Sequence, residues 1–138
     1  MKYPVKLIEA EEGGYVVKFP DVPEALTQAD NMQDALNEGL DALVTAFEFY
    51  FEDGDRIPSP SKLENYEHFV ELPLSVEAKI LMLNTFIDSK ITQVELANRM
   101  NVKKQEVTRL FDLNHSTKID TIQKAIAAMG HRLNLSYI

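Results

Sequence analysis

Long polar side chains between residues 103 and 109 have the types and spacing needed to read a nucleic acid. Four of them fall on one face of a short helix at helical spacing: Lys104, Gln105, Thr108 and Arg109. Amide and guanidinium groups can hydrogen-bond to base edges in the DNA major groove, and ammonium groups bind phosphates. Lys103 directly precedes this helix and would add a phosphate contact that is independent of base sequence. We therefore predict that this helix face binds DNA.

The polar face needs a second helix to hold it, and the sequence predicts one that begins after Thr92. Thr92 and Glu95 form a T-x-x-E capping box, and Asn101 can take the left-handed backbone that ends a helix. An apolar stripe would bury the opposite side of the polar helix: Val107, Leu110 and Phe111. A plain two-helix corner with a solvated polar face is the alternative that this pattern leaves open.

The net charge of −8 is divided unevenly along the chain of 138 residues. Residues 1–75 contain 5 basic and 16 acidic side chains, a net charge of −11. Residues 76–138 contain 9 basic and 6 acidic side chains, a net charge of +3. Such asymmetry indicates two modules with different partners. The second half can approach a polyanion, whereas the first half suits a basic partner.

The first half has the alternation and turn residues of a small sheet followed by a helix. The expected order is β-β-β-α-β, with elements near residues 3–7, 15–19, 25–29, 31–52 and 68–72. Asp30 or Asn31 would cap the helix. Apolar residues at helical spacing would form its buried stripe: Leu36, Leu40, Leu43, Val44, Phe47 and Phe51. Its other face is acidic and is either a solvated surface or a docking face for a basic protein: Asp34, Glu38, Asp41, Glu48 and Glu52.

The second half is predicted to be all-α up to a terminal strand. Ser75 would cap the first helix, whose expected stripe is Val76, Ile80, Leu83, Phe86 and Ile87. Ser116 or Thr117 would cap the last helix, which Gly130 ends. The tail then alternates polar residues with Leu133, Leu135 and Tyr137. A lone strand needs a partner. We expect pairing with a second copy, and a dimer suits a DNA reader that binds two half-sites.

The chain lacks the residue clusters expected of an enzyme. It has no cysteine, and its three histidines lie far apart without metal-ligand spacing: His68, His115 and His131. A metal-dependent nuclease needs several converging carboxylates, and Asp21 is the one strand-proximal candidate. We therefore expect no catalysis, metal or cofactor. No apolar run approaches the roughly 20 residues of a membrane span, and no signal peptide is evident, so we expect a cytoplasmic protein.

Two segments carry a family resemblance. GYVVKFPDVPEALTQADNMQDALNEGLDAL, residues 14–43, resembles the N-terminal domain of HicB-type antitoxins from HicA–HicB toxin–antitoxin modules. Residues 76–130 resemble the Xre-type, lambda-repressor-like helix-turn-helix. The run FEFYFEDGDRIPSPS, residues 47–61, is similar to the enterobacterial HicB branch. In many HicB domains a Gly-Asp pair precedes the helix, and here it is Ala29-Asp30.

The resemblance implies an α+β protein with a degenerate ribonuclease-H-like domain and a C-terminal helix-turn-helix domain. The expected toxin-binding domain spans residues 1–55, or to about residue 73 with the last strand. A linker covers residues 56–67, and the DNA-binding domain with its dimerising strand covers residues 74–138. Gln93 matches the glutamine that opens the first motif helix in repressors, where it touches phosphate or supports a base contact.

The resemblance also implies a function. The protein would neutralise a small basic HicA-type toxin that cleaves mRNA, and would repress its own operon by binding operator DNA as a homodimer or homotetramer. No motif places the toxin contacts, so we hypothesise them from chemistry: Tyr15, Asp21, Asp34, Glu38 and Asp41. A one-component transcriptional regulator with a ligand-sensing N-terminal domain is the alternative.

Overall fold

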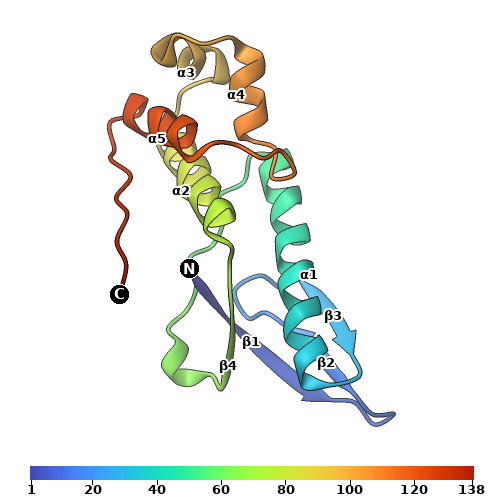
Figure 1. The fold of residues 1–138 in the computed structure, drawn as a ribbon. Helices are drawn as coiled ribbons and strands as arrows, with labels where there is room; N and C mark the ends of the chain where they lie inside the picture. Colours follow the sequence, from blue (N-terminus) through green and yellow to red (C-terminus); the bar gives the residue numbers. More distant parts are fainter. The chain divides into compact units, whose positions relative to one another are not determined.

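All 138 residues are described in the computed structural model, which has a mixed α+β fold (Figure 1). The chain divides into two compact units. The first contains Met1–Tyr50 and Pro58–Leu74, and the second contains Phe51–Ile57 and Ser75–Ile138. The segment Phe51–Ile57 therefore belongs to the same unit as the later helices, whereas the sequence predicts that the first domain continues to residue 55. None of the helices has the length and apolar character needed to cross a membrane.

The first unit is built on a four-stranded antiparallel sheet. The strands are β1 (Lys2–Glu9), β2 (Tyr15–Lys18), β3 (Leu26–Ala29) and β4 (His68–Glu71), in the order β3-β2-β1-β4. Gly13 and Gly14 have positive φ angles of 96° and 75° in the turn between β1 and β2, as the hairpin prediction required. The strands predicted in this half are all present.

The long helix α1 (Met32–Asp53) follows β3 and packs on the sheet. Asn31, one of the two predicted caps, begins it: its Oδ1 accepts from the Asp34 N–H at 2.9 Å, and its Nδ2 donates to the Asp34 carboxylate at 3.0 Å. Gly39 lies close to the sheet, since a Cβ added there would be 3.1 Å from Val17 Cγ1. The absence of a side chain at Gly39 thus lets α1 pack close to the sheet. Three members of the predicted stripe are only half-buried: Leu36, Leu40 and Val44.

The predicted linker is more ordered than an exposed loop. It contains a short 3₁₀ helix, η1 (Leu63–Asn65), before β4. Within the first unit the Tyr3 hydroxyl donates to the Pro58 carbonyl at 2.7 Å. The Asp21 carboxylate accepts from the Ser61 N–H at 2.8 Å and from the Ser61 hydroxyl. Asp21 therefore anchors this loop in the first unit.

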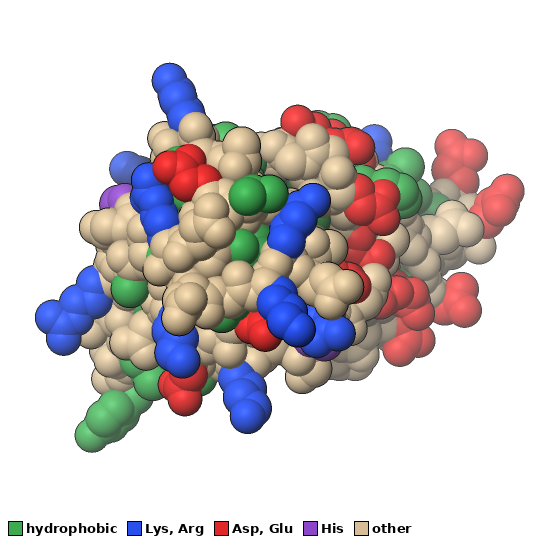
Figure 2. Space-filling view, turned by 90° about the horizontal axis from the view of Figure 1, so that it is seen from above, with side chains coloured by type: hydrophobic (Ala, Val, Ile, Leu, Met, Phe, Trp, Pro, Cys, Tyr) green, Lys and Arg blue, Asp and Glu red, His purple; other side chains and the backbone are tan.

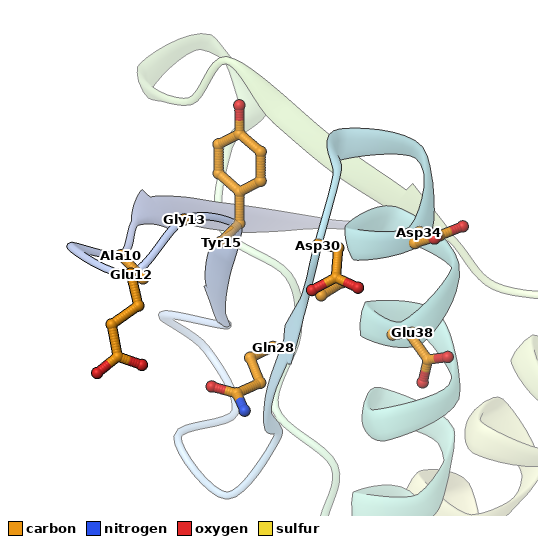
Figure 3. A pocket seen from close by; sticks show the side chains of 9 residues that line it. Ala10, Glu12, Gly13, Tyr15, Gln28, Asp30, Asp34 and Glu38 are labelled. Atoms are coloured by element: carbon orange, nitrogen blue, oxygen red, sulfur yellow. The ribbon is translucent and has the colours of Figure 1, made fainter.

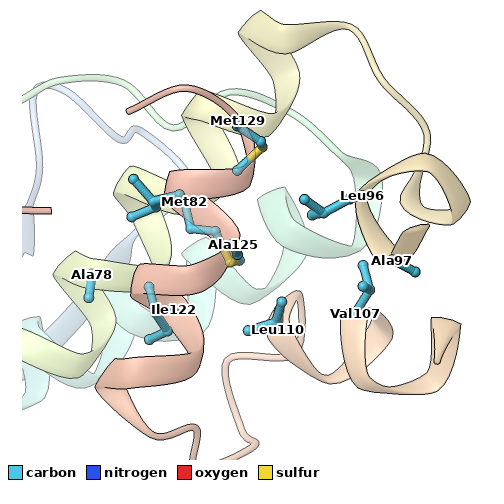
Figure 4. Close-up of a cluster of buried hydrophobic side chains, with 10 residues drawn as sticks. Ala78, Met82, Leu96, Ala97, Val107, Leu110, Ile122, Ala125 and Met129 are labelled. Atoms are coloured by element: carbon cyan, nitrogen blue, oxygen red, sulfur yellow. The ribbon is translucent and has the colours of Figure 1, made fainter. Parts of the chain in front are cut away.

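The second unit is a cluster of four helices: α2 (Leu74–Ser89), α3 (Gln93–Met100), α4 (Lys104–Leu110) and α5 (Ile119–Ala128). Every helix contributes to one apolar core (Figure 4), formed by Ala78, Met82, Leu96, Ala97, Val107, Leu110, Ile122, Ala125, Ile126 and Met129. On α2 this core uses Ala78 and Met82, which the predicted stripe did not include. Ile80 and Leu83 are also buried, so α2 is apolar on more than one side and periodicity could not single out a face.

The segment Phe51–Ile57 is attached to α2 by hydrogen bonds. The side-chain amide of Asn84 accepts from the Ile57 N–H at 2.9 Å and donates to the Ile57 carbonyl at 3.2 Å. Arg56 forms an ion pair with Asp88 at 2.7 Å. These contacts explain why the segment belongs to the second unit.

Two local predictions for the second unit, both of helix caps, were wrong, and a third is not tested by a single chain. α2 begins at Leu74, so Ser75 lies in its first turn. The residue before α5 is Lys118, which makes no side-chain cap, and the Thr117 hydroxyl instead bonds to the His115 carbonyl at 3.5 Å. The third prediction is the strand at residues 131–138, which form no strand in the single chain, where no neighbouring strand is available to pair with them.

The tail nevertheless keeps part of the predicted pattern. Leu133 packs partly buried against the core of the second unit, whereas Leu135 and Tyr137 are almost fully exposed, at 86% and 98%. The proposed pairing with a second copy stays a prediction.

Candidate nucleic-acid interface and acidic surface

The turn between α3 and α4 has the local geometry that the sequence predicted. The Thr92 hydroxyl accepts from the Glu95 N–H at 3.1 Å and caps α3. The Glu95 carboxylate does not complete the predicted box but binds Arg99 at 3.2 Å. Asn101 is left-handed, with φ 56° and ψ 46°, and the next N–H, of Val102, donates to the Ala97 carbonyl at 3.0 Å. This tight ending turns the chain directly into α4.

Helix α4 is divided into a buried and an exposed face. Val107 and Leu110 are 0% and 1% exposed and lie in the core of the second unit. The third predicted residue of the stripe, Phe111, is half-buried and its ring centroid lies 4.7 Å from that of Phe86. The predicted DNA-contact residues of this segment are all exposed: Lys103, Lys104, Gln105, Thr108 and Arg109.

Gln93, at the start of α3, lies beside this exposed face. Its Oε1 is 3.5 Å from the Thr108 hydroxyl, which also lies 3.2 Å from the Lys104 carbonyl of the preceding turn. The structure therefore brings the glutamine of one helix next to the polar face of the other, and groups the six predicted residues around one surface.

Some cations of the second unit are bound within the protein, whereas those next to the exposed face of α4 are not. Arg56 pairs with Asp88, and Arg99 binds both Glu95 and the Ala128 carbonyl. The side chains of Lys103, Lys104 and Arg109 make no ion pair or hydrogen bond within the protein. Figure 2 views the second unit from the side that carries α3 and α4, and Lys and Arg side chains project from this side. These unpaired charges remain available for an external polyanion.

The first unit has an acidic surface formed by three elements (Figure 3). A pocket of about 460 Å³ opens between the β1–β2 turn, β3 and the first turns of α1. Its carboxylates are those of Glu12, Asp30, Asp34 and Glu38, and Tyr15 also lines it. No group of three His, Asp or Glu side chains lies close enough together to hold a metal ion.

The structure brings together three of the five residues hypothesised to contact a toxin. Tyr15, Asp34 and Glu38 line the acidic pocket, although Asp34 is also tied to Asn31 by the helix cap. Asp41 lies exposed elsewhere on α1, and Asp21 is occupied by Ser61. Glu12 and Asp30 were not among the residues hypothesised from the sequence. Asp30 lies just before the start of α1, whereas Glu12 approaches the α1 carboxylates because the hairpin folds beside that helix.

Comparison with known proteins identifies the family. Residues 2–81 match the family described as the HicB-like antitoxin of bacterial toxin–antitoxin systems. The chain belongs to the HicB-like antitoxin family. It is 63% identical over 136 residues to "Antitoxin HicB 1" of Photorhabdus laumondii, a match that covers 99% of this chain and 86% of the relative. It is 56% identical over 135 residues to "Antitoxin HicB" of Escherichia coli K12, with 98% of each chain covered.

A more distant relative, "Antitoxin HicB" of Pseudomonas fluorescens, is 32% identical over 130 residues, covering 94% of this chain and 89% of the relative. These findings support an antitoxin role and a toxin partner for this HicB-like chain, and they suggest that it is not an enzyme. The family match ends at residue 81, so α3 and α4 lie outside it.

The second unit of this HicB-like antitoxin also contains a buried lysine that the sequence analysis missed. Lys79 on α2 is 3% exposed, and its Nζ donates to the carbonyls of Asp112 and His115, both at 2.7 Å, and of Arg109 at 3.4 Å. Burial lowers the pKa of the Lys79 ammonium below its usual 10.5, although the Asp112 carboxylate opposes the shift. Its acceptors lie at least 30 residues away in sequence, so no local spacing could have revealed it.

Proposed function

We propose that this antitoxin binds and neutralises a HicA-type mRNA-cleaving toxin with its first unit and represses its own operon by placing α4 in the operator major groove. The observation that carries the proposal is the set of unpaired polar and cationic side chains on α4, in a protein whose other unit has an acidic surface. The first unit would then be a degenerate ribonuclease-H-like domain, and the second an Xre-type helix-turn-helix.

The DNA-binding part of the proposal is supported by the separation of the two faces of α4. Its inner face is anchored by Val107 and Leu110, so the outer face can enter a groove without disturbing the core. Gln105 and Arg109 have the groups that form paired hydrogen bonds with adenine and guanine. Lys103 and Lys104 stand at the beginning of the helix, where they can meet phosphates.

The toxin-binding part is supported by charge. Residues 1–75 have a net charge of −11, and the carboxylates of Glu12, Asp30, Asp34 and Glu38 surround one pocket. Complementary charge accelerates association and selects a basic partner over an acidic one. A protein that senses a small ligand usually has a largely apolar pocket with a few polar groups. This pocket is lined by several carboxylates instead, which argues against the ligand-sensing alternative.

Dimerisation through residues 131–138 completes the proposal. Leu135 and Tyr137 are exposed apolar side chains on an extended segment, and pairing with a second copy would cover them. Two copies would present two α4 helices to successive half-sites of an operator. In a homotetramer, each of two such dimers would be formed by the same pairing of residues 131–138.

Operator binding is tested with the full-length protein and a duplex from the promoter of its own operon. Gln105→Ala should weaken operator binding by roughly 1–3 kcal/mol, because the paired contact to a base is lost. Gln123→Ala is the matched control, since Gln123 is an exposed glutamine of α5. Equal affinities for the wild type and Gln105→Ala in a fluorescence anisotropy titration would show that α4 is not the recognition helix.

Toxin neutralisation is tested by co-expression with the small basic protein encoded beside the antitoxin. Wild-type antitoxin should restore growth, and the double variant Glu38→Lys and Asp41→Lys should not, because it places cations opposite a basic partner. The double variant Glu64→Lys and Glu67→Lys is the control, since it makes the same charge change on exposed residues of η1 and the segment that follows it. If the double variant restores growth as well as wild type, the acidic face of α1 is not the docking surface.

A further inference from the structure

Lys79 joins α2 to the end of α4 and to the loop that follows it. An ammonium group has three N–H donors, and the structure gives each an acceptor: the carbonyls of Arg109, Asp112 and His115. Arg109 is in the last turn of α4, and the other two acceptors are in the loop before α5. Charge-assisted hydrogen bonds of this kind are directional and about twice as strong as neutral ones.

The end of α4 has few other restraints of comparable direction. The last carbonyls of a helix lack intrahelical partners, and here the N–H groups of Phe111 and Asp112 reach only those of Thr108 and Arg109. Val107 and Leu110 hold the inner face of α4 by apolar contacts, and the Phe111 ring lies 4.7 Å from that of Phe86, but none of these contacts is a hydrogen bond to another helix. The ammonium therefore adds directional hydrogen bonds to the apolar packing that holds this end of α4.

A pocket beside Lys79 shows that side-chain packing does not hold the loop from that side. The pocket has a volume of about 240 Å³ and is lined by the first turns of α2 and by residues 113–117. Without the ammonium, the loop and the end of α4 would have space into which to relax.

We propose that Lys79 is the positioning residue that sets the orientation of α4 for operator recognition. The proposal rests on the DNA-binding function proposed above. Arg109 links Lys79 to the proposed DNA surface. Its carbonyl accepts a hydrogen bond from Lys79, and its exposed side chain is one of the predicted DNA contacts. Base contacts need their groups held within about 0.5 Å, so a small shift of α4 should affect base recognition more than phosphate binding.

The test uses the full-length protein in a graded series: Lys79→Arg keeps the charge and donors, Lys79→Gln keeps two donors without the charge, and Lys79→Met removes both. Anisotropy titrations measure the affinity of each variant for the operator duplex and for a scrambled duplex of equal length. The control is Lys124→Met, which removes an exposed lysine of α5. Circular dichroism and thermal melts establish that each variant is folded at the titration temperature.

Lys79→Met should lose about 10-fold in operator affinity while its affinity for the scrambled duplex changes less than about 2-fold, because orientation matters mainly for base contacts. Lys79→Arg should recover most of the loss, Lys79→Gln should be intermediate, and toxin binding should not change. Equal losses on both duplexes, or unchanged operator affinity in folded Lys79→Met, would overturn the proposal. If Lys79→Met does not fold, the comparison of Lys79→Gln with Lys79→Arg decides in the same way.

Failure of the underlying function has a different result. If the wild type binds operator and scrambled duplexes equally, specific DNA recognition is refuted, and the positioning role with it. If the wild type discriminates between the duplexes and the graded series does not alter that discrimination, the positioning role alone is refuted.

Discussion

The two units of this antitoxin use their charges differently. In the second unit Arg56, Lys79 and Arg99 are bound to carboxylates or carbonyls of the protein itself. The cations next to α4 are left without partners. In the first unit the acidic side chains are far more numerous than the basic ones, and several line a single pocket. Lys124 on α5 is exposed and unpaired as well, whereas Lys103, Lys104 and Arg109 gather around one helix. The grouping of unpaired charges therefore indicates which surface meets a partner better than the net charge does.

A core substitution in one unit should impair the function proposed for that unit and spare the function of the other. Leu43 is buried in the first unit and Leu110 in the second. Leu43→Ala and Leu110→Ala should each lower the free energy of unfolding by about 2–5 kcal/mol, because each leaves a cavity. Chemical denaturation followed by toxin and operator titrations should show toxin binding impaired in the first variant and operator binding in the second. If each variant loses both toxin binding and operator binding, the two units unfold together and the two functions cannot be assigned to separate units.

Paired and unpaired arginines of the second unit can be compared directly. Arg109→Ala should weaken operator binding by roughly 1–3 kcal/mol, because its guanidinium is free to contact a base. Arg99→Ala should leave operator affinity unchanged and cost less than about 1 kcal/mol of stability, since an exposed pair contributes little. The comparison between unpaired and paired charges fails if the two variants bind the operator equally well.

A lysine that meets only phosphate should have a weaker and less specific effect. Lys103→Ala should lower affinity for operator and scrambled duplexes alike, and the slope of log affinity against log salt should fall by about 0.9. Titrations at several salt concentrations measure this slope, with Lys124→Ala as the control for an exposed lysine on α5. A specific loss on the operator alone would place Lys103 at a base.

The pH dependence of stability should reveal the one buried cation. Because burial lowers the pKa of Lys79 in the folded protein, the unfolded chain binds more protons between that pKa and 10.5. Stability should therefore contain a component that rises with pH in this window, by at most about 1.4 kcal/mol per pH unit. Denaturation at a series of pH values should show the rise in wild type and Lys124→Met but not in Lys79→Met. Identical profiles for all three proteins would contradict the burial of the charge.

Local signals predicted much of this fold. The strands, α1 and the α3–α4 turn depend on alternation, helical spacing, Thr92 and Asn101, all of which act between neighbouring residues. The predicted DNA-contact residues are exposed on one surface because the polar face of α4 is opposite a strong apolar stripe. Their contact with DNA remains a prediction.

The unpredicted features depend on contacts distant in sequence. Residues 51–57 join the second unit through Asn84, and the loop before α5 is organised around Lys79 rather than around a cap at Ser116 or Thr117. The acidic pocket likewise needs the hairpin and β3 to fold beside α1. The partners Asn84 and Ile57, Lys79 and His115, and Glu12 and Glu38 are each more than 20 residues apart, far beyond helical or strand spacing.

The division of Phe51–Ile57 from its neighbours in sequence has a practical consequence. The chain leaves the first unit after Tyr50, returns at Pro58 and leaves again after Leu74. No single cut can therefore release either unit as one continuous fragment, and a nick near Gly54 should yield two pieces that stay associated until denaturant is added. A recombination event that exchanged only the second unit between relatives would also have to exchange residues 51–57, which lie between two parts of the first unit. Exchange of the whole chain requires no such second crossover.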